Sequence, residues 1–169
     1  MTLDFAISQL RRGPASYEAI TQGLDAEEFL WRPGPGKWSV LEVLCHLADE
    51  EREDFRKRLD LTLHQPDQPW PGIDPEAWVT ERAYQERDPQ ASLEDFLAER
   101  ARSLAWLDTL VEPDFERAKQ HPALGTMRAG DFLVSWAAHD LLHLRQIVIL
   151  RLGWMKVAAT PFNMDYASP

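Results

Sequence analysis

Cysteine is almost missing from this chain, and so are long uninterrupted hydrophobic runs and any excess of positive charge. Cys45 is the single cysteine, so the chain can form no intramolecular disulfide and no cluster of thiolates that would hold a metal ion. The N-terminal stretch carries charge within its first apolar segment, which predicts neither a secretory signal peptide nor a membrane span. We therefore expect a cytoplasmic protein whose stability comes from packing.

Acidic residues outnumber basic ones, with 28 Asp and Glu against 18 Lys and Arg, for a formal net charge of -10 at pH 7. Binding to phosphates requires a surplus of Lys and Arg on one face of a protein. The composition therefore argues against nucleic acid and anionic membranes as partners. At 169 residues and 44% hydrophobic content, the chain suffices for one buried core and is short for two, so residues 1–169 are predicted to form a single domain.

Glycine and proline fall in clusters, and these clusters divide the chain into four long helical segments. The first is predicted over residues 3–23, with Pro14 either kinking the helix or starting a second half, because an interior proline removes one backbone hydrogen bond. The second segment begins after Ser39, which is placed to cap it. Its predicted core face consists of Val40, Leu44, Leu47, Ala48, Phe55 and Leu59.

The third and fourth segments also show helical spacing. The third is predicted to start at Ser92 in a capping box, with a core face of Leu93, Phe96, Leu97, Ala101, Leu104 and Leu107. The fourth, residues 129–153, is apolar almost all round, which predicts burial on most of its sides.

The connection between the second and third segments is rich in proline and tryptophan, including Trp70 and Trp78. At roughly thirty residues it is too long for a plain connection between bundle helices, so we expect it to pack over the bundle as a crossover. Alternating β-branched residues with turn signals are absent, so no β-strand is predicted.

His139 and His143 stand one helical turn apart in the fourth segment, so their imidazoles project from the same face. The pair lies among Phe132, Trp136 and Leu150, where an imidazole without a partner would cost on the order of 1 to 3 kcal/mol. A metal ion would supply the missing partner, and a hydrogen-bonded pair of core histidines is the alternative interpretation. A catalytic site with one open position needs a third ligand from another helix.

His46 is the candidate for this third ligand, although its position on the second helix leaves two interpretations open. Ser39, Glu42, Glu50 and Glu53 share its side of the helix, and such a polar stripe is typical of a solvated surface. The same stripe could instead line a water-filled cleft at the open end of the bundle, where Glu42 or Glu50 would orient His46. Helical spacing alone does not decide between the two.

Two blocks of sequence around these histidines resemble a known family. The first is GKWSVLEVLCHLADEE, residues 36–51, and the second is HDLLHLRQI, residues 139–147. Together they resemble the DinB-like (YfiT-like) metalloenzyme superfamily, and the resemblance extends from the first helix through Gly153. It implies an all-α four-helix bundle of up-down-down-up topology, usually a homodimer, in which three histidines hold nickel or zinc. His46, His139 and His143 match the three ligand positions.

The resemblance also implies a kind of chemistry, because characterised relatives include S-transferases that use low-molecular-weight thiols and a thiol-dependent isomerase. We therefore expect a metal-dependent enzyme, either a thiol S-transferase or a hydrolase, that activates a thiol or water nucleophile toward a small-molecule substrate. A low-molecular-weight thiol would serve as cosubstrate in the first case. The alternatives are a non-catalytic dimeric bundle that binds metal or is stabilised by it, and a bundle with no metal function.

Four polar residues near the histidines are candidates for supporting roles. Glu42, Asp49 and Glu50 are candidates for proton transfer, and Gln146 is a candidate for hydrogen bonding to a ligand histidine or contacting the substrate. The alternative for each carboxylate is an exposed position on the helix surface.

The other residues of interest receive simpler predictions. Cys45 is expected to be a packing residue, because neighbouring side chains on a helix point about 100 degrees apart and Cys45 therefore points away from the His46 site. His64 and His121 are expected in solvent-facing loops. Trp38 and Trp136 are expected to wall the cleft.

Overall fold

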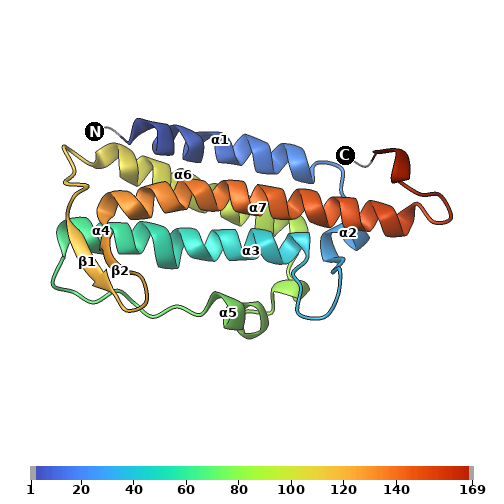
Figure 1. Ribbon diagram of the computed structural model, residues 1–169, viewed down its shortest axis with the longest axis horizontal. Helices are drawn as coiled ribbons and strands as arrows, with labels where there is room; N and C mark the ends of the chain where they lie inside the picture. The colour runs from blue at the N-terminus through green and yellow to red at the C-terminus, as the bar shows by residue number, and fades with distance from the viewer. Residues whose placement is uncertain (1–2, 168–169) are drawn as a thin grey trace.

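Four long helical segments lie side by side in the computed structural model, which describes residues 3–167. They are α1 (Asp4–Thr21), the continuous run of α3 (Val40–Glu50), η1 (Glu51–Phe55) and α4 (Arg56–His64), then α6 (Pro89–Thr109) and α7 (Ala129–Ala158). The helices α1 and α7 run in one direction, and α3–α4 and α6 run in the other (Figure 1). The predicted all-α bundle of up-down-down-up topology is confirmed.

The connection between α4 and α6 runs along the outside of the bundle, as the predicted crossover does (Figure 1). It contains the short helices α5 (Pro75–Glu81) and η2 (Tyr84–Glu86), while α2 (Ala26–Leu30) lies before α3 and η3 (Asp165–Ala167) follows α7. Trp78 and Tyr84 of the crossover are buried against Leu41 and Cys45 of α3. These apolar contacts hold the crossover on the outer side of α3.

A short β-hairpin precedes α7, so the prediction that no strand forms was wrong. Strand β1 (Ala118–His121) pairs antiparallel with β2 (Gly125–Arg128). Gly125 takes a positive φ of 77° at the turn, a conformation that glycine adopts without strain. The strands are short and mostly exposed, so they lack the alternating apolar pattern on which sequence-based prediction of strands depends.

Helix α1 continues through Pro14 as one helix and does not start again there. A proline at this position leaves the carbonyl of Leu10 without its helical N–H partner. Arg100 of α6 takes the place of that partner, since its Nη1 donates to Leu10 O at 3.1 Å. Gly13 makes room for this contact, because a Cβ atom there would lie 2.6 Å from Asp140 Oδ2 and 2.8 Å from Arg100 Nη1. The Gly13-Pro14 pair therefore marks a contact between helices and not a helix end.

Helix α6 begins at Pro89, about one turn before the predicted capping box at Ser92. Asp88 is the N-cap, and its side chain accepts a hydrogen bond from Ala91 N at 2.8 Å. Ser92 is buried inside the helix, where its hydroxyl donates to Asp88 O. The predicted start at Ser92 was wrong. Asp88 followed by Pro89 is the stronger start signal, because aspartate caps a helix and proline is favoured in its first turn.

Helix α7 was predicted to be buried on most sides, and one of its apolar stripes is exposed instead. We call this stripe the α7 ridge. Its residues are 39–54% exposed and recur at helical spacing: Val134, Leu141, Val148, Leu152 and Met155. The opposite side of the helix is buried as predicted, at Phe132, Trp136 and Leu150. Within residues 3–167, no helix combines the length and the apolar content needed to cross a membrane.

The apolar core among residues 3–167 has three clusters, and α1 and α7 contribute to two of them. Leu10 and Trp136 belong to one cluster of buried side chains, and Tyr17 and Ile147 belong to the other. Both α1 and α7 therefore pass from one cluster to the other, and His139 and His143 lie on α7 between Trp136 and Ile147. A buried ionic layer lies at the same level of the bundle and consists of Glu51, Arg100 and Asp140.

Candidate metal centre

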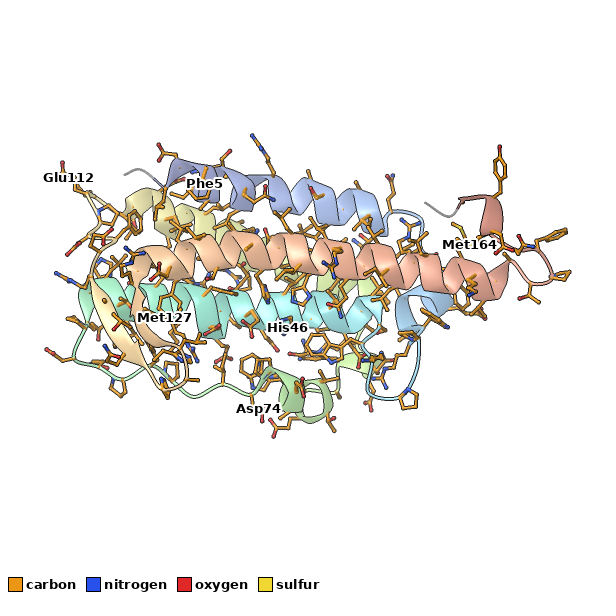
Figure 2. The ribbon with its side chains drawn as sticks, in the orientation of Figure 1. Phe5, His46, Asp74, Glu112, Met127 and Met164 are labelled. Carbon is orange, nitrogen blue, oxygen red and sulfur yellow. The ribbon has the colours of Figure 1, made fainter. Side chains whose placement is uncertain are left out.

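Three histidine side chains come together between α3 and α7. His46 lies on α3, and Figure 2 shows it midway along the bundle. His139 and His143 lie one turn apart on α7. One ring nitrogen from each forms a cluster in which all three atoms lie within 4.8 Å of one another. His46 is 5% exposed and the other two are partly exposed, so the solvated surface position considered for His46 does not apply.

The three Nε2 atoms converge on one point. His139 Nε2 lies 3.3 Å from His46 Nε2 and 3.0 Å from His143 Nε2. Two nitrogen ligands of a tetrahedral ion, each about 2.0–2.1 Å from it, are separated from each other by about 3.3 Å. These two separations are close to that of ligands to one shared ion, and three such ligands would leave one of four positions open.

Hydrogen bonding fixes which nitrogen of His143 faces the cluster. His143 Nδ1 donates to Gln146 Oε1 at 2.7 Å, because an amide oxygen can only accept. The neutral ring then carries its lone pair on Nε2, the atom that faces the other two histidines. A single proton can join only two of the three converging nitrogens, so the donor set suits a cation better than a hydrogen-bonded network.

Burial keeps the three imidazoles in the neutral form that binds metal ions. Burial, together with the adjacent His143, lowers the pKa of His46 to about 3. Burial and the neighbouring histidines lower the pKa of His139 to about 2. The pKa of His143 is also lowered by burial, although its hydrogen bond with Gln146 acts in the opposite direction. At neutral pH none of the three needs to lose a proton before it can bind a cation.

Aromatic rings enclose the histidines on two sides. The ring of Trp38 lies 4.8 Å from that of His46 and stacks parallel to His143 at 6.4 Å, which confirms the predicted wall. Phe55, at the end of the π-helical turn η1, lies 5.0 Å from His139. Trp136 was also predicted to wall the cleft, but its ring stacks on Phe55 at 5.7 Å and so lies behind this wall.

Of the polar residues considered for supporting roles, Gln146 lies beside His143 and Glu50 lies beside His46. Gln146 Oε1 accepts the hydrogen bond from His143 Nδ1 described above. Glu50 is buried, and its Oε1 lies 4.0 Å from His46 Nδ1, which has no hydrogen-bond partner among residues 3–167. Burial, reinforced by the neighbouring carboxyl of Asp54, raises the pKa of Glu50 above its usual range.

Glu42 and Asp49 are also buried, and their carboxylates are occupied by other partners. Glu42 accepts hydrogen bonds from Ser39 N and from Arg32 Nε at 2.8 and 2.9 Å, so it completes the capping box of α3. Asp49 accepts from Tyr84 Oη at 2.5 Å and pairs with Arg52 and Arg82. These contacts join Glu42 to the loop before α3, and Asp49 to the crossover.

The ionic layer lies directly behind His139, and no pattern in the sequence predicted it. Arg100 donates to both carboxylate oxygens of Asp140, at 2.6 and 2.7 Å, and to Glu51 Oε1. Tyr17 Oη donates to the backbone carbonyl of Asp140, so α1 contributes to the same layer. Because Asp140 follows His139 in the chain, these contacts fix the part of α7 that carries the histidine pair. The one sequence feature that could have indicated this layer is the Gly13-Pro14 pair inside α1, because it marks the close contact of α1 with Arg100.

Three other residues from the sequence analysis lie apart from the cluster. Cys45 is buried and packs as predicted, with burial raising the pKa of its thiol. His64 ends α4, is half-exposed and pairs with Asp60. His121 ends strand β1, and its Nδ1 accepts from Ala123 N and Leu124 N, so it is a turn residue of the hairpin.

Comparison with known proteins gives one family and two named relatives. The sequence model of the DinB superfamily matches residues 9–147. A Bacillus licheniformis protein named "Putative metal-dependent hydrolase" is 27% identical over 158 residues, which cover 88% of this chain and 85% of the relative. YfiT of Bacillus subtilis has the same descriptive name and is 32% identical over 126 residues, covering 70% and 68%.

Two solved structures share the fold. That of Bacillus subtilis YfiT, described as "a probable metal-dependent hydrolase with an unusual four-helix bundle topology", is 25% identical, covers 91% of both chains and has a TM-score of 0.78. That of a mycothiol-dependent maleylpyruvate isomerase is 19% identical and has a TM-score of 0.69. This second match covers 87% of this chain and 61% of the isomerase, and at that identity it shows the fold alone.

Proposed function

Because the chain belongs to the DinB superfamily, we propose that it is a metal-dependent enzyme that acts on a small molecule, with hydrolysis as the first candidate reaction. The observation that carries the proposal is the convergence of three ring nitrogens within 4.8 Å. His46, His139 and His143 would be the ligands, and zinc or nickel the ion, since imidazole suits both. The names of the two relatives support hydrolysis.

A divalent ion held by three neutral imidazoles supplies Lewis acidity, which lets water or a thiol react as its anion near neutral pH. The protein's own residues prepare the site for it. Gln146 holds the ring of His143 with Nε2 toward the cluster. Glu50 Oε1 lies near His46 Nδ1 and would hold that ring with its Nε2 toward the cluster as well. Proton transfer also falls to Glu50, because the carboxylates of Glu42 and Asp49 bind arginines.

Thiol transfer is the second candidate reaction, with a low-molecular-weight thiol as cosubstrate. The observation that favours it is the fold shared with a mycothiol-dependent isomerase, at 19% identity. Cobalt-substituted protein distinguishes the two reactions, since cobalt absorbs visible light according to its ligands. A spectrum that shifts on addition of thiols would support thiol transfer, and an unchanged spectrum would reject a thiol cosubstrate.

The first test of the proposed function is elemental analysis of untagged protein purified without chelators. Wild type should hold about one divalent ion per chain, and His46→Ala and His143→Ala should both lose it, because two imidazoles no longer complete the site. His64→Ala is the matched control, since His64 is half-exposed on α4 and lies outside the cluster. A wild-type protein that stays empty after metal is added, or site variants that keep their metal, would contradict the proposal.

We also propose that the working form is a homodimer joined through the α7 ridge. The ridge is an apolar stripe on the longest helix, interrupted by Arg145 between Leu141 and Val148, and its apolar residues are exposed in the single chain. Apolar surface of this kind is commonly covered by a second subunit.

A further inference from the structure

A pocket adjoins the histidine cluster between α7 and the loop at residues 33–38. Its volume is about 670 Å³, which is within the range of small-molecule sites. Trp38 and Gln146 line the pocket and also contact the histidines, so the pocket and the cluster share two walls. Most of the remaining wall is apolar and consists of Pro33, Pro35, Leu142, Ile149 and Leu150.

Two cationic side chains, Lys37 and Arg145, also line the pocket, and no carboxylate does. Both are exposed, and neither forms an ion pair with an acidic residue among residues 3–167. Most arginines of this acidic chain do form such pairs, including Arg32, Arg100 and Arg151. Lys37 and Arg145 can therefore bind an anion without first breaking an internal ion pair.

The loop that forms one side of the pocket has a defined conformation. Gly36 takes a positive φ of 69°, which a glycine adopts without strain, and Lys37 N donates to Gly34 O at 3.2 Å. Ser39 then caps α3 through Glu42, so the residues on both sides of Trp38 are held in place. The walls contributed by this loop are thus formed before any ligand binds.

We propose that this pocket binds the substrate of the metal site, and that the substrate is a small carboxylate with an apolar body. The apolar walls and Trp38 would cover the body, and Arg145 would bind the carboxylate, since a guanidinium can donate two parallel hydrogen bonds to one carboxylate. Lys37 adds a second positive charge. The inference rests on the proposed function, because a ligand of this pocket is a substrate only if the adjoining histidine cluster, with which the pocket shares Trp38 and Gln146, holds a catalytic metal ion.

The α7 ridge does not fill the pocket. On α7, Leu142 follows Leu141 and Ile149 follows Val148, so these two pocket residues point about 100 degrees away from their ridge neighbours. Arg145 lies four residues after Leu141, at the edge of the ridge. A second copy of the chain that packs on the ridge therefore leaves the apolar floor of the pocket to a ligand.

Calorimetric titration of the full chain tests the proposal. The probes are straight-chain carboxylates from butanoate to octanoate and 4-phenylbutanoate, each compared with the alcohol of the same carbon skeleton. We expect at least one carboxylate to bind about tenfold more tightly than its alcohol, and Arg145→Gln to remove that difference. Arg12→Gln is the matched control, because Arg12 is exposed on α1 and forms no ion pair among residues 3–167. It should leave the affinity unchanged.

Metal content is measured on every sample, and the titration is repeated after the metal is removed. Binding that persists without metal and still depends on Arg145 supports the pocket, whatever becomes of the proposed reaction. Binding that requires the metal and is unchanged in Arg145→Gln would put the carboxylate on the ion, which overturns the pocket and leaves the metal enzyme intact.

Two further outcomes would also overturn the pocket. One is a series in which no carboxylate binds more tightly than its alcohol in metal-loaded protein. The other is an affinity that falls as the protein concentration rises, because a second copy of the chain would then occupy the pocket.

Discussion

Gly13 lies against the ionic layer, at a point of α1 where there is no room for a Cβ atom. Helical glycine is unfavourable by roughly 1 kcal/mol relative to alanine, so its presence in the middle of α1 calls for a reason. The reason is steric, since a Cβ there would lie 2.6 Å from Asp140 Oδ2. The next residue, Pro14, frees the carbonyl of Leu10 to accept from Arg100. Two residues that weaken an isolated helix thus fit α1 to the partner helices.

Gly13→Ala is therefore expected to destabilise the protein by about 1–3 kcal/mol, because the added methyl group displaces Arg100 or Asp140 from the ion pair. Alanine has a higher helix propensity than glycine, which stabilises α1, but this gain is smaller than the loss from the displaced ion pair. Urea denaturation followed by circular dichroism measures the difference in the free energy of unfolding. Gly72→Ala is the control, since nothing lies within 4 Å of a Cβ at that position. A Gly13→Ala variant as stable as the control would show that the layer adapts without cost.

At the scale of secondary-structure elements, Arg100 joins four segments of the bundle. It donates to Leu10 of α1, Glu51 of η1 and Asp140 of α7 from its own position on α6. Its side chain is 1% exposed, and those of Glu51 and Asp140 are 2% and 0% exposed. Removing one partner of such a buried set leaves the opposite charges without compensation.

Arg100→Leu is expected to lower the free energy of unfolding by about 3–5 kcal/mol, because two carboxylates would remain buried without their cation. Arg102→Leu is the matched control on the same helix. Its guanidinium pairs with Glu99 but is 64% exposed, so its loss should cost about 1 kcal/mol or less. Equal effects of the two substitutions in urea denaturation would contradict a structural role for the layer.

The same layer shows where sequence-based prediction ends. On α6, helical spacing identified Leu93, Phe96 and Leu107 as buried, and they are. It also assigned Ala101 to the core, and Ala101 is exposed, whereas its neighbour Arg100 is fully buried. Periodicity treats any charged residue as a surface residue, and an arginine becomes a core residue only through partners on other helices.

For the site, the sequence alone predicted the His139–His143 pair but not the setting of His46. On α3 every residue from Val40 to Glu50 is buried, so its polar stripe faces other elements of the fold and not solvent. What covers the stripe is α7, Trp38 and the crossover, and no pattern within α3 encodes their positions. The family resemblance supplied this long-range information, because it links residues 36–51 with residues 139–147.

At the scale of the whole molecule, the exposed α7 ridge is the feature that a single chain does not explain. Its residues are 39–54% exposed, in a protein whose other helices bury their apolar faces against one another. A stable interface buries about 800 Å² on each partner, and α7 extends for 30 residues, long enough to contribute to such an area. The histidines lie on the other side of α7, toward α3, so two copies can pair without closing the metal site.

We therefore expect wild-type protein to sediment as a dimer at micromolar concentration and a Val148→Glu, Leu152→Glu double variant to sediment as a monomer, because like charges would face each other across a two-fold axis. Metal content and helical circular dichroism should not change, since both side chains point into solvent in the single chain. Leu124→Glu is the control, because Leu124 is 69% exposed at the hairpin turn, away from the ridge. A monomeric wild type would show that the ridge does not need a second copy. A double variant that stays dimeric while Leu124→Glu dissociates would place the dimer contact at the hairpin and not at the ridge.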